Sequence, residues 1–395
     1  MNSIKFFDEK LNVENKKIIL RTDYNVPIIN EDIKEKTRID LTIPFIKKLV
    51  SKKAKIILIS HLGRPTNNDD NNFSLKPVYK YLKKYLNNIS FFEGLIDKNI
   101  RQKIDLLNKS EIIMLENIRF NPGEMSNEDE FAKNLSSIGE IYINEAFSCC
   151  HRKQASVHKI ASFVKKCFAG PQFKKEVESI NLILKNKKKP VTCIVGGSKV
   201  STKIGVIKSL IKLSDNIVIV GAMANNFIAY NSHNVGSSLL EKGSDKIIEK
   251  LYSYSLKNDC KIVIPEDCCV SNDRSGKSIC KDLGQVADNE MILDIGKKTI
   301  FNILKIIDNS KTVFWNGPAG YFENENFLSG TISIAKKISE NTKNKNLLSI
   351  VGGGDTVSAI SNSKINYRFT HLSTAGGAFL EFIEGKNLPG VEVLK

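Results

Sequence analysis

The sequence predicts an α/β protein built from two doubly wound domains with mainly parallel sheets. Short apolar runs rich in β-branched residues recur along the chain, and segments with helical spacing of apolar residues separate them. That alternation is typical of parallel strands that helices cover on both faces. A chain of 395 residues is also too long for one comfortable hydrophobic core. Its apolar content of 41% and charged content of 26% are those of a globular protein.

The predicted strands fall into two groups, one on each side of Gly170. The predicted strands of the first part lie in 16–22, 54–60, 111–117 and 140–146. Those of the second part lie in 191–197, 216–222, 261–267, 312–317, 347–353 and 370–377. Each run is short, continuous and apolar, as expected of strands buried on both faces.

A connecting helix is predicted between the two groups, within residues 171–189. Its residues Phe173, Val177, Ile180 and Leu184 recur at helical spacing, and lysines gather toward the C-terminal end before Pro190. The predicted domains are therefore 1–170 and 171–378. The alternative is an ordinary surface helix of one domain.

The composition argues for a cytosolic protein and against a nucleic-acid partner. The net charge of +16 divides evenly between the two halves and forms no basic arm, so we do not expect a nucleic-acid partner. No apolar stretch reaches the ~20 residues that span a bilayer, and the N-terminal segment lacks an apolar signal core. The eight cysteines include two adjacent pairs, show no Cys-x-x-Cys and no zinc-like spacing, and are expected to be reduced, mostly buried thiols without a metal cluster.

Basic residues follow the predicted strands of the first half. Ligands of open parallel sheets bind beyond the carboxyl ends of the strands, so these residues are expected to meet at one edge. They are Arg21, His61, Arg64, Arg119, His151 and Arg152, with Arg38 on the loop after the first strand. Guanidinium groups cannot lose their protons, and a cluster of them indicates an anionic ligand with carboxylate or phosphate oxygens. The alternative is a separate surface salt bridge for each arginine.

Glycines follow the predicted strands of the second half. The clusters lie in 195–203, 220–227, 315–323, 351–360 and 373–379. Glycine lets the backbone approach a ligand closely, and the next helix offers its amides to phosphate. Lys199 and Lys203 are four residues apart, so one helical face could present both to a polyphosphate, and Asp355 could bind Mg²⁺. The motifs of P-loop enzymes, dinucleotide-binding folds and protein kinases are missing from the sequence.

Taken together, the motifs resemble, in the same order, those of phosphoglycerate kinases. They are "RTDYNVP", "SHLGRP", "LENIRF", "NEAFSCCHR", "GGSKVSTKI", "WNGPAGYFE", "GGGDT" and "STAGGAFLEFIEGKNLPGV". The resemblance implies two Rossmann-like domains joined by a hinge. It implies that the first binds 3-phosphoglycerate or 1,3-bisphosphoglycerate and the second MgATP or MgADP. It also implies that the segment 379–395 packs back on the first domain and that the protein is a monomer.

The resemblance also implies roles for individual residues. The glycerate substrate would be held by Asp23, Asn25, Arg38, His61, Arg64, Arg119 and Arg152. The nucleotide would be held by Gly196, Gly197, Lys199, Lys203, Gly221, Gly296, Asn316, Glu323, Gly353, Gly354, Asp355 and Thr356, with Asp355 as the metal ligand. Arg38, Lys199, Gly354 and Gly377 would surround or neutralise the phosphoryl group in transit, with Thr356 and Gly376 beside it. No general base is expected, because a carboxylate acceptor is already ionised at neutral pH.

The sequence departs from the family pattern around the hinge and the adenine pocket. The departures are Glu145, Cys149, Cys150, Gln172, Asn225, Asn226, Ala375 and Phe379. None of them replaces a charged ligand, so activity is expected. A binding protein that keeps the fold but has lost turnover is the alternative.

Overall fold

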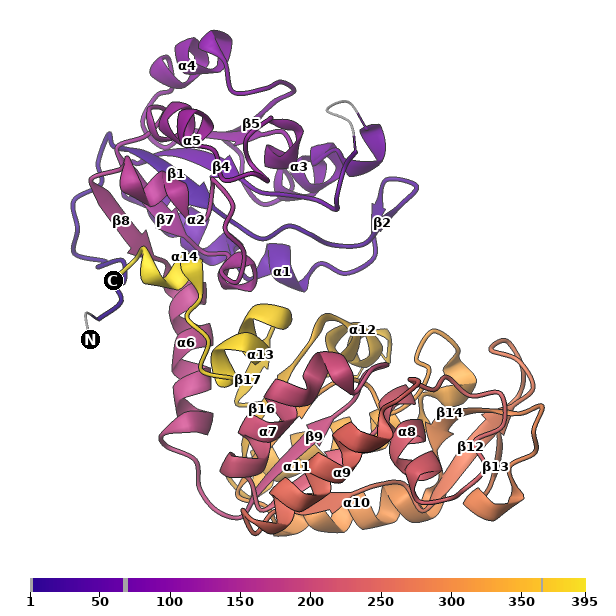
Figure 1. Ribbon diagram of the computed structural model, residues 1–395. Coiled ribbons are helices and arrows are strands. Elements are labelled where there is room, and N and C mark those ends of the chain that lie inside the picture. Colours follow the sequence, from indigo (N-terminus) through magenta and orange to yellow (C-terminus); the bar gives the residue numbers. More distant parts are fainter. Residues whose placement is uncertain (1–2, 67–69, 364) are drawn as a thin grey trace. The chain divides into compact units, whose positions relative to one another are not determined.

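The computed structural model describes residues 3–66, 70–363 and 365–395, and its chain divides into two compact units. Unit 1 comprises Met1–Glu178, Gly377–Phe382 and Lys386–Lys395, and unit 2 comprises Ser179–Gly376 and Ile383–Gly385. Figure 1 shows the elements of each. The division falls inside helix α6 (Pro171–Leu184), which ends five residues before the predicted limit.

The sheet of unit 1 is parallel throughout, and β1 (Lys17–Arg21) pairs with strands on both sides. The order is β5-β6-β4-β1-β7-β8. The other strands are β4 (Lys55–Ile59), β5 (Ile89–Phe92), β6 (Ile112–Leu115), β7 (Ile141–Asn144) and β8 (Lys166–Ala169). A small antiparallel pair, β2 (Ile28–Ile29) and β3 (Asp32–Ile33), follows β1.

Alternate residues of these strands point to opposite faces of the sheet, so the apolar runs bury both. On one face, Ile18 and Ile56 belong to the same core as Ile46 of α2 and Leu82 of α3. The helices of unit 1 are α1 (Thr37–Asp40), α2 (Ile43–Ser51), α3 (Lys76–Leu82), α4 (Lys98–Asp105), α5 (Asp129–Ser136) and α14 (Pro389–Glu392), with the start of α13 (Gly377–Ile383).

The C-terminal segment completes unit 1. The Gly390 N–H donates to the Cys150 carbonyl (2.9 Å), and the Lys5 N–H donates to the Leu394 carbonyl (2.8 Å). The rings of Phe147 and Phe382 meet edge to face at 5.9 Å. Figure 1 shows α14 in yellow among the elements of unit 1.

Unit 2 contains a second parallel sheet, of order β11-β10-β9-β15-β16-β17. Its strands are β9 (Val191–Val195), β10 (Asn216–Ile219), β11 (Lys261–Val263), β15 (Thr312–Asn316), β16 (Leu348–Gly352) and β17 (His371–Ser373). Ile194, Trp315 and Val351 pack on one face against residues of α10 and α11. The helices are α7 (Ile204–Leu213), α8 (Ala222–Tyr230), α9 (Asp245–Leu256), α10 (Lys297–Asn309), α11 (Ser329–Asn344) and α12 (Gly354–Asn362).

The α/β class with two Rossmann-like domains is thus confirmed. The sequence did not predict β5 and β8 of the first sheet, the β2-β3 pair or a further small sheet in unit 2. A three-stranded antiparallel sheet, β13-β12-β14, lies in unit 2. Its strands are β12 (Asp267–Ser271), β13 (Ile279–Asp282) and β14 (Met291–Ile295). Throughout the described ranges, each helix is too short or too polar to cross a bilayer.

This small sheet corrects the prediction that all cysteines are reduced. Cys269 of β12 and Cys280 of β13 stand opposite each other in register and form a disulfide. Directly opposed residues of antiparallel strands bring their Cβ atoms within disulfide range. The sequence did not predict this disulfide, because the two cysteines, 11 residues apart, are brought together only by the antiparallel pairing of β12 and β13.

Candidate active site

The carboxyl ends of the strands in unit 1 bring several basic side chains together. Arg21 is the last residue of β1, His61 lies two residues past β4, and Arg119 lies in a short helix after β6. Arg152 follows the helical turn after β7. Electrostatic repulsion from Arg21 and Arg152 acts on both His61 and Arg119, which shows that the groups share one region. We call Arg21, Arg38, His61, Arg119 and Arg152 the basic cluster.

Arg21 anchors the basic cluster. It is fully buried, its Nε donates to Ser156 Oγ (2.9 Å), and its Nη1 donates to the Thr22 carbonyl. Ser156 in turn donates from both its N–H and its hydroxyl to the buried carboxylate of Glu124. Glu124 was not predicted as part of the site. It supplies a negative charge that raises the pKa of Arg21 against the opposing effect of burial.

Asp23 holds Arg38 in place. Arg38 Nη1 donates to Asp23 Oδ2 (2.8 Å) and to the Asn25 carbonyl (3.1 Å). Burial raises the pKa of Asp23, but the charge of Arg38 and the hydrogen bond from the Ser148 hydroxyl outweigh burial and lower that pKa to about 2. Asp23 is therefore a carboxylate at any neutral pH, and the position of Arg38 depends on it.

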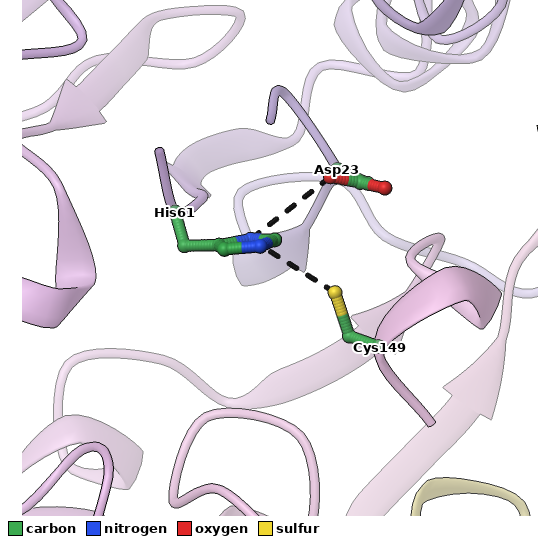
Figure 2. Close-up of side chains that lie close together, drawn as sticks. All are labelled: Asp23, His61 and Cys149. Atoms are coloured by element: carbon green, nitrogen blue, oxygen red, sulfur yellow. Dashed lines mark hydrogen bonds and ion pairs between the residues drawn. The ribbon is translucent and has the colours of Figure 1, made fainter. Parts of the chain in front are cut away.

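His61 is buried and neutral. Burial, then repulsion by Arg21, lowers its pKa well below the usual value. Figure 2 shows its ring between Asp23 and Cys149: His61 Nδ1 lies 3.9 Å from Asp23 Oδ1 and 3.9 Å from Cys149 Sγ. A neutral imidazole can still donate one hydrogen bond and accept another, which suits a polar, anionic ligand.

Asp23, His61 and Cys149 include ligand types that bind metals, and their ligand atoms lie within 4.8 Å of one another. The sequence predicted no metal cluster. Two features argue against a metal here: Arg21 Nη2 lies 3.4 Å from the same His61 Nδ1, and burial raises the pKa of the Cys149 thiol, which disfavours the thiolate that metals bind. We therefore interpret His61 as a member of the basic cluster, with Asp23 and Cys149 as its neighbours, and not as part of a metal site.

Arg119 and Arg152 complete this region. Arg119 Nη1 donates to the Gly63 carbonyl, and its buried Nε has no hydrogen-bond partner within the described residues. Burial, then Arg21, lowers the pKa of Arg119 to about 10. Arg152 Nε donates to His151 Nε2 (3.0 Å). Arg64 is exposed on the loop whose Gly63 N–H donates to Asn25 Oδ1.

Unit 2 contains a pocket of about 360 Å³ at the carboxyl ends of its strands. Four residues predicted to bind nucleotide line it: Gly197, Gly221, Glu323 and Asp355. Gly221 adopts φ +67° at the start of α8, and a Cβ there would lie 3.1 Å from the Pro318 carbonyl. Only glycine accommodates that turn easily, and it brings the backbone up to the pocket.

Lys203 does not line this pocket but lies next to it, since a Cβ on the lining residue Gly197 would be 2.9 Å from the Lys203 ammonium. Its ammonium donates to the carbonyl of Gly196 and lies 3.5 Å from Asn316 Oδ1. Burial lowers its pKa and the charge of Asp355 raises it, so the two side chains are neighbours. Thr356 Oγ1 accepts the Gly317 N–H (2.7 Å), which ties the start of α12 to the end of β15.

Lys199 corrects the prediction of a shared helical face. Lys199 lies in an irregular loop and is exposed, whereas Lys203 ends a short helix at Ser201–Lys203 and is partly buried. The two lysines therefore approach from different kinds of backbone. Glu241 accepts the N–H groups of Val200 and Ser201 and so holds this loop against unit 2.

Comparison with known proteins decides what these two sites belong to. A family model described as phosphoglycerate kinase matches residues 9–386. A phosphoglycerate kinase of Wolbachia sp. subsp. Drosophila simulans is 42% identical over 390 residues, 98% of each chain, and that of Buchnera aphidicola subsp. Schizaphis graminum is 43% identical over 389 residues, 98% of this chain and 97% of the other. The chain belongs to the phosphoglycerate kinase family.

A solved structure agrees. The phosphoglycerate kinase of Coxiella burnetii superposes with a TM-score of 0.83 at 36% identity, covering 98% of this chain and 97% of that one. The predicted family and enzyme class are confirmed. The activity is that of a phosphoglycerate kinase, an ATP-dependent phosphotransferase whose acceptor is a carboxyl group.

Some residues that the resemblance to phosphoglycerate kinases singled out do not line the pocket of unit 2, and Lys199, Lys203 and Thr356 are among them. Gly196 lies behind it, where a Cβ would meet the Pro318 carbonyl at 2.6 Å. Gly296 starts α10, and a Cβ there would lie 2.2 Å from the Asp267 carboxylate. Gly354 is exposed at the start of α12, and Gly377 at the start of α13 belongs to unit 1. Gly353 and Asn316 pack against each other, since a Cβ on Gly353 would lie 2.9 Å from Asn316 Nδ2.

Asn225 and Asp294 are among the side chains that line the pocket without having been predicted as ligands. Burial raises the pKa of Asp294 to about 7, although the N–H groups of Ile295 and Gly330 both donate to it. The only signal for Asn225 was its departure from the family pattern.

Proposed function

We propose that the basic cluster of unit 1 binds 3-phosphoglycerate or 1,3-bisphosphoglycerate and that the pocket of unit 2 binds ATP or ADP with Mg²⁺. One observation supports the binding of the glycerate substrate by unit 1. The cationic side chains of the basic cluster are not all paired with acidic groups or hydrogen-bond acceptors among the described residues. Arg119 is the clearest case, because its buried Nε is unpaired among the described residues while its neighbours Arg21 and Arg152 repel it. A ligand with phosphate and carboxylate oxygens would satisfy these donors two at a time.

The pocket of unit 2 supports the second half of the proposal. Its mixture of close backbone, apolar side chains and a few polar groups is typical of sites for small organic ligands. Lys203 and the start of α12 lie at the end where Asp355 lines the pocket, and both attract phosphate. Glu323, also on the wall, could accept hydrogen bonds from ribose hydroxyls.

Asp355 fits the role of a magnesium ligand. It is exposed in the first turn of α12, on the pocket wall, and one carboxylate together with phosphate oxygens and water is a common Mg²⁺ environment. When bound, the ion would neutralise part of the charge of the nucleotide phosphates.

The reaction that these residues serve needs alignment and charge neutralisation. The acceptor carboxylate is ionised, so no side chain has to remove a proton. In-line transfer spreads negative charge over the moving phosphoryl group, and we assign Arg38 and Lys199 to its neutralisation. Asp23 holds Arg38 ready, since their ion pair is 2.8 Å long and Asp23 is ionised.

The proposal includes a hinge between the two units, and it extends to the oligomeric state, the location in the cell and the absence of nucleic-acid binding. Helix α6 passes from unit 1 to unit 2 at Glu178–Ser179, so bending near it would bring the substrates together and exclude water. We also propose a monomer that works in the cytoplasm and does not bind nucleic acid. The even spread of the lysines supports the last point.

A coupled assay with 3-phosphoglycerate and MgATP tests the proposal directly. Arg119→Gln should raise KM for 3-phosphoglycerate with little effect on nucleotide binding, and Lys199→Ala should do the reverse. Lys246→Ala, an exposed lysine of α9, is the control and should change neither. Ligand binding without turnover would instead identify an inactive binding protein, and exchanged effects of the two variants would show that the units are assigned backwards.

A further inference from the structure

Part of the lining of the nucleotide pocket is apolar, and a buried amide lies among these side chains. Ile228, Leu239 and Ile292 line this part of the pocket together with Asn225 of α8. Apolar side chains of this kind suit a purine base better than a phosphate. The polar groups on the edge of a base would then have to find partners on the same walls.

Asn225 presents an acceptor that none of the described residues uses. The residue is 1% exposed, and its Oδ1 is buried with no hydrogen-bond partner among the described residues. Its Nδ2 lies 3.4 Å from the Leu239 carbonyl. That carbonyl fixes the orientation of the amide, because the opposite orientation would place two acceptors against each other.

The other buried polar side chains of the pocket are already engaged. Ser238 Oγ accepts the Ile292 N–H (2.8 Å). The two carboxyl oxygens of Asp294 accept the N–H groups of Ile295 and Gly330. Asn225 Oδ1 therefore stands out on this wall as an acceptor whose desolvation is uncompensated until a ligand arrives.

We propose that Asn225 selects the base of the nucleotide by accepting a hydrogen bond from the amino group at C6 of adenine. This inference rests on the proposed seat of the nucleotide in unit 2. A base with an oxygen at C6 places an acceptor opposite Oδ1, and a base with only hydrogen there leaves Oδ1 unpaired. Sites that pair a buried polar group with a ligand donor reject analogues that lack the donor.

The test compares ATP, GTP and purine riboside triphosphate, which differ at C6, in the coupled assay. For the unmodified protein we expect kcat/KM with ATP to exceed that with purine riboside triphosphate by about 10-fold or more. Asn225→Leu, of similar size, and Asn225→Ala should both reduce this ratio to about 1, because neither retains the acceptor. Calorimetric titration with ADP and purine riboside diphosphate should show the same change in the ratio of Kd values.

Asn226→Ala is the matched control. Asn226 is equally buried and neighbours Asn225 in α8, but its Oδ1 accepts the Glu241 N–H (2.8 Å) and it does not line the pocket. Its loss should lower stability and leave the ATP ratio unchanged. A ratio near 1 in the unmodified protein, or one that Asn225→Leu and Asn225→Ala both preserve, would overturn the role of Asn225. Absence of any turnover or nucleotide binding would instead overturn the proposed function itself.

Discussion

Replacement of Glu145 by glutamine should change how the stability of unit 1 depends on pH. Glu145 lies just past β7 and is 5% exposed. Its Oε2 accepts the Gln172 N–H at the start of α6 (2.9 Å), and its Oε1 has no partner among the described residues. Burial is the main cause that raises its pKa to about 8 from an ordinary value of 4.5.

The raised pKa fixes the sign and size of the effect. Below pH 4.5 the folded and unfolded chains both carry this proton; between 4.5 and about 8 the unfolded chain releases it and the folded chain keeps it. The free energy of unfolding therefore falls by about 1.4 kcal/mol per pH unit across this window, a total of about 5 kcal/mol. Glu145→Gln keeps the acceptor for Gln172 and removes the titration.

The assay is urea unfolding followed by far-UV circular dichroism at several pH values, with Trp315 fluorescence reporting unit 2 separately, where Trp315 is buried. From pH 5 to 8, the stability of Glu145→Gln relative to the unmodified protein should rise by about 4 kcal/mol. The comparison cancels Asp294, which is present in both proteins and whose pKa is also raised. Glu130→Gln, an exposed acid of α5, should show no such trend. A difference that stays constant with pH would refute the reasoning.

Three further predictions concern the site and the small sheet. Arg38→Ala should lower kcat by roughly 10³-fold while circular dichroism shows an intact fold, and near-normal turnover would remove Arg38 from the mechanism. Asp355→Asn should raise the Mg²⁺ concentration needed for half-maximal rate by roughly 10-fold, as measured by titration, and an unchanged requirement would place the ion elsewhere. Cys280→Ser, or reduction of the Cys269–Cys280 disulfide, should destabilise the hairpin by about 3 kcal/mol at most. A melting temperature that neither the reductant nor the substitution changes would contradict this prediction.

The sequence predicted the parallel sheets because their strands are buried on both faces. Runs such as that of β4 are continuous and β-branched, so neither a loop nor a surface helix would accommodate them. The antiparallel strands were missed because β13 is mostly exposed, with the polar sequence ICKD. β12, with its acid and its adjacent cysteines, also lacks the usual composition of a buried strand.

The candidate site was predicted in its charges but not in its internal contacts. Arg21 and Arg119 could be located because strand ends meet at one edge of a parallel sheet. Glu124 lies 103 positions from Arg21 in the sequence and is linked to it through Ser156, and no local pattern encodes such an arrangement. The orphan acceptor of Asn225 and the contact of Gly170 with Glu145, where a Cβ would lie 1.7 Å from Oε1, likewise arise only from tertiary packing.

The return of the C-terminal segment to unit 1 affects the order of events on the ribosome. Gly390 sits so close to Cys150 and Val157 that a Cβ on it would lie 2.7 Å from the valine side chain. Cys150 and Val157 are synthesised early, whereas the segment Lys386–Lys395 that covers them is synthesised after all of unit 2. Unit 1 therefore lacks this segment while unit 2 is being synthesised. A ribosome that stalls before residue 386 leaves a nascent chain in which Cys150 and Val157 are uncovered, and chaperones bind apolar surface exposed in this way.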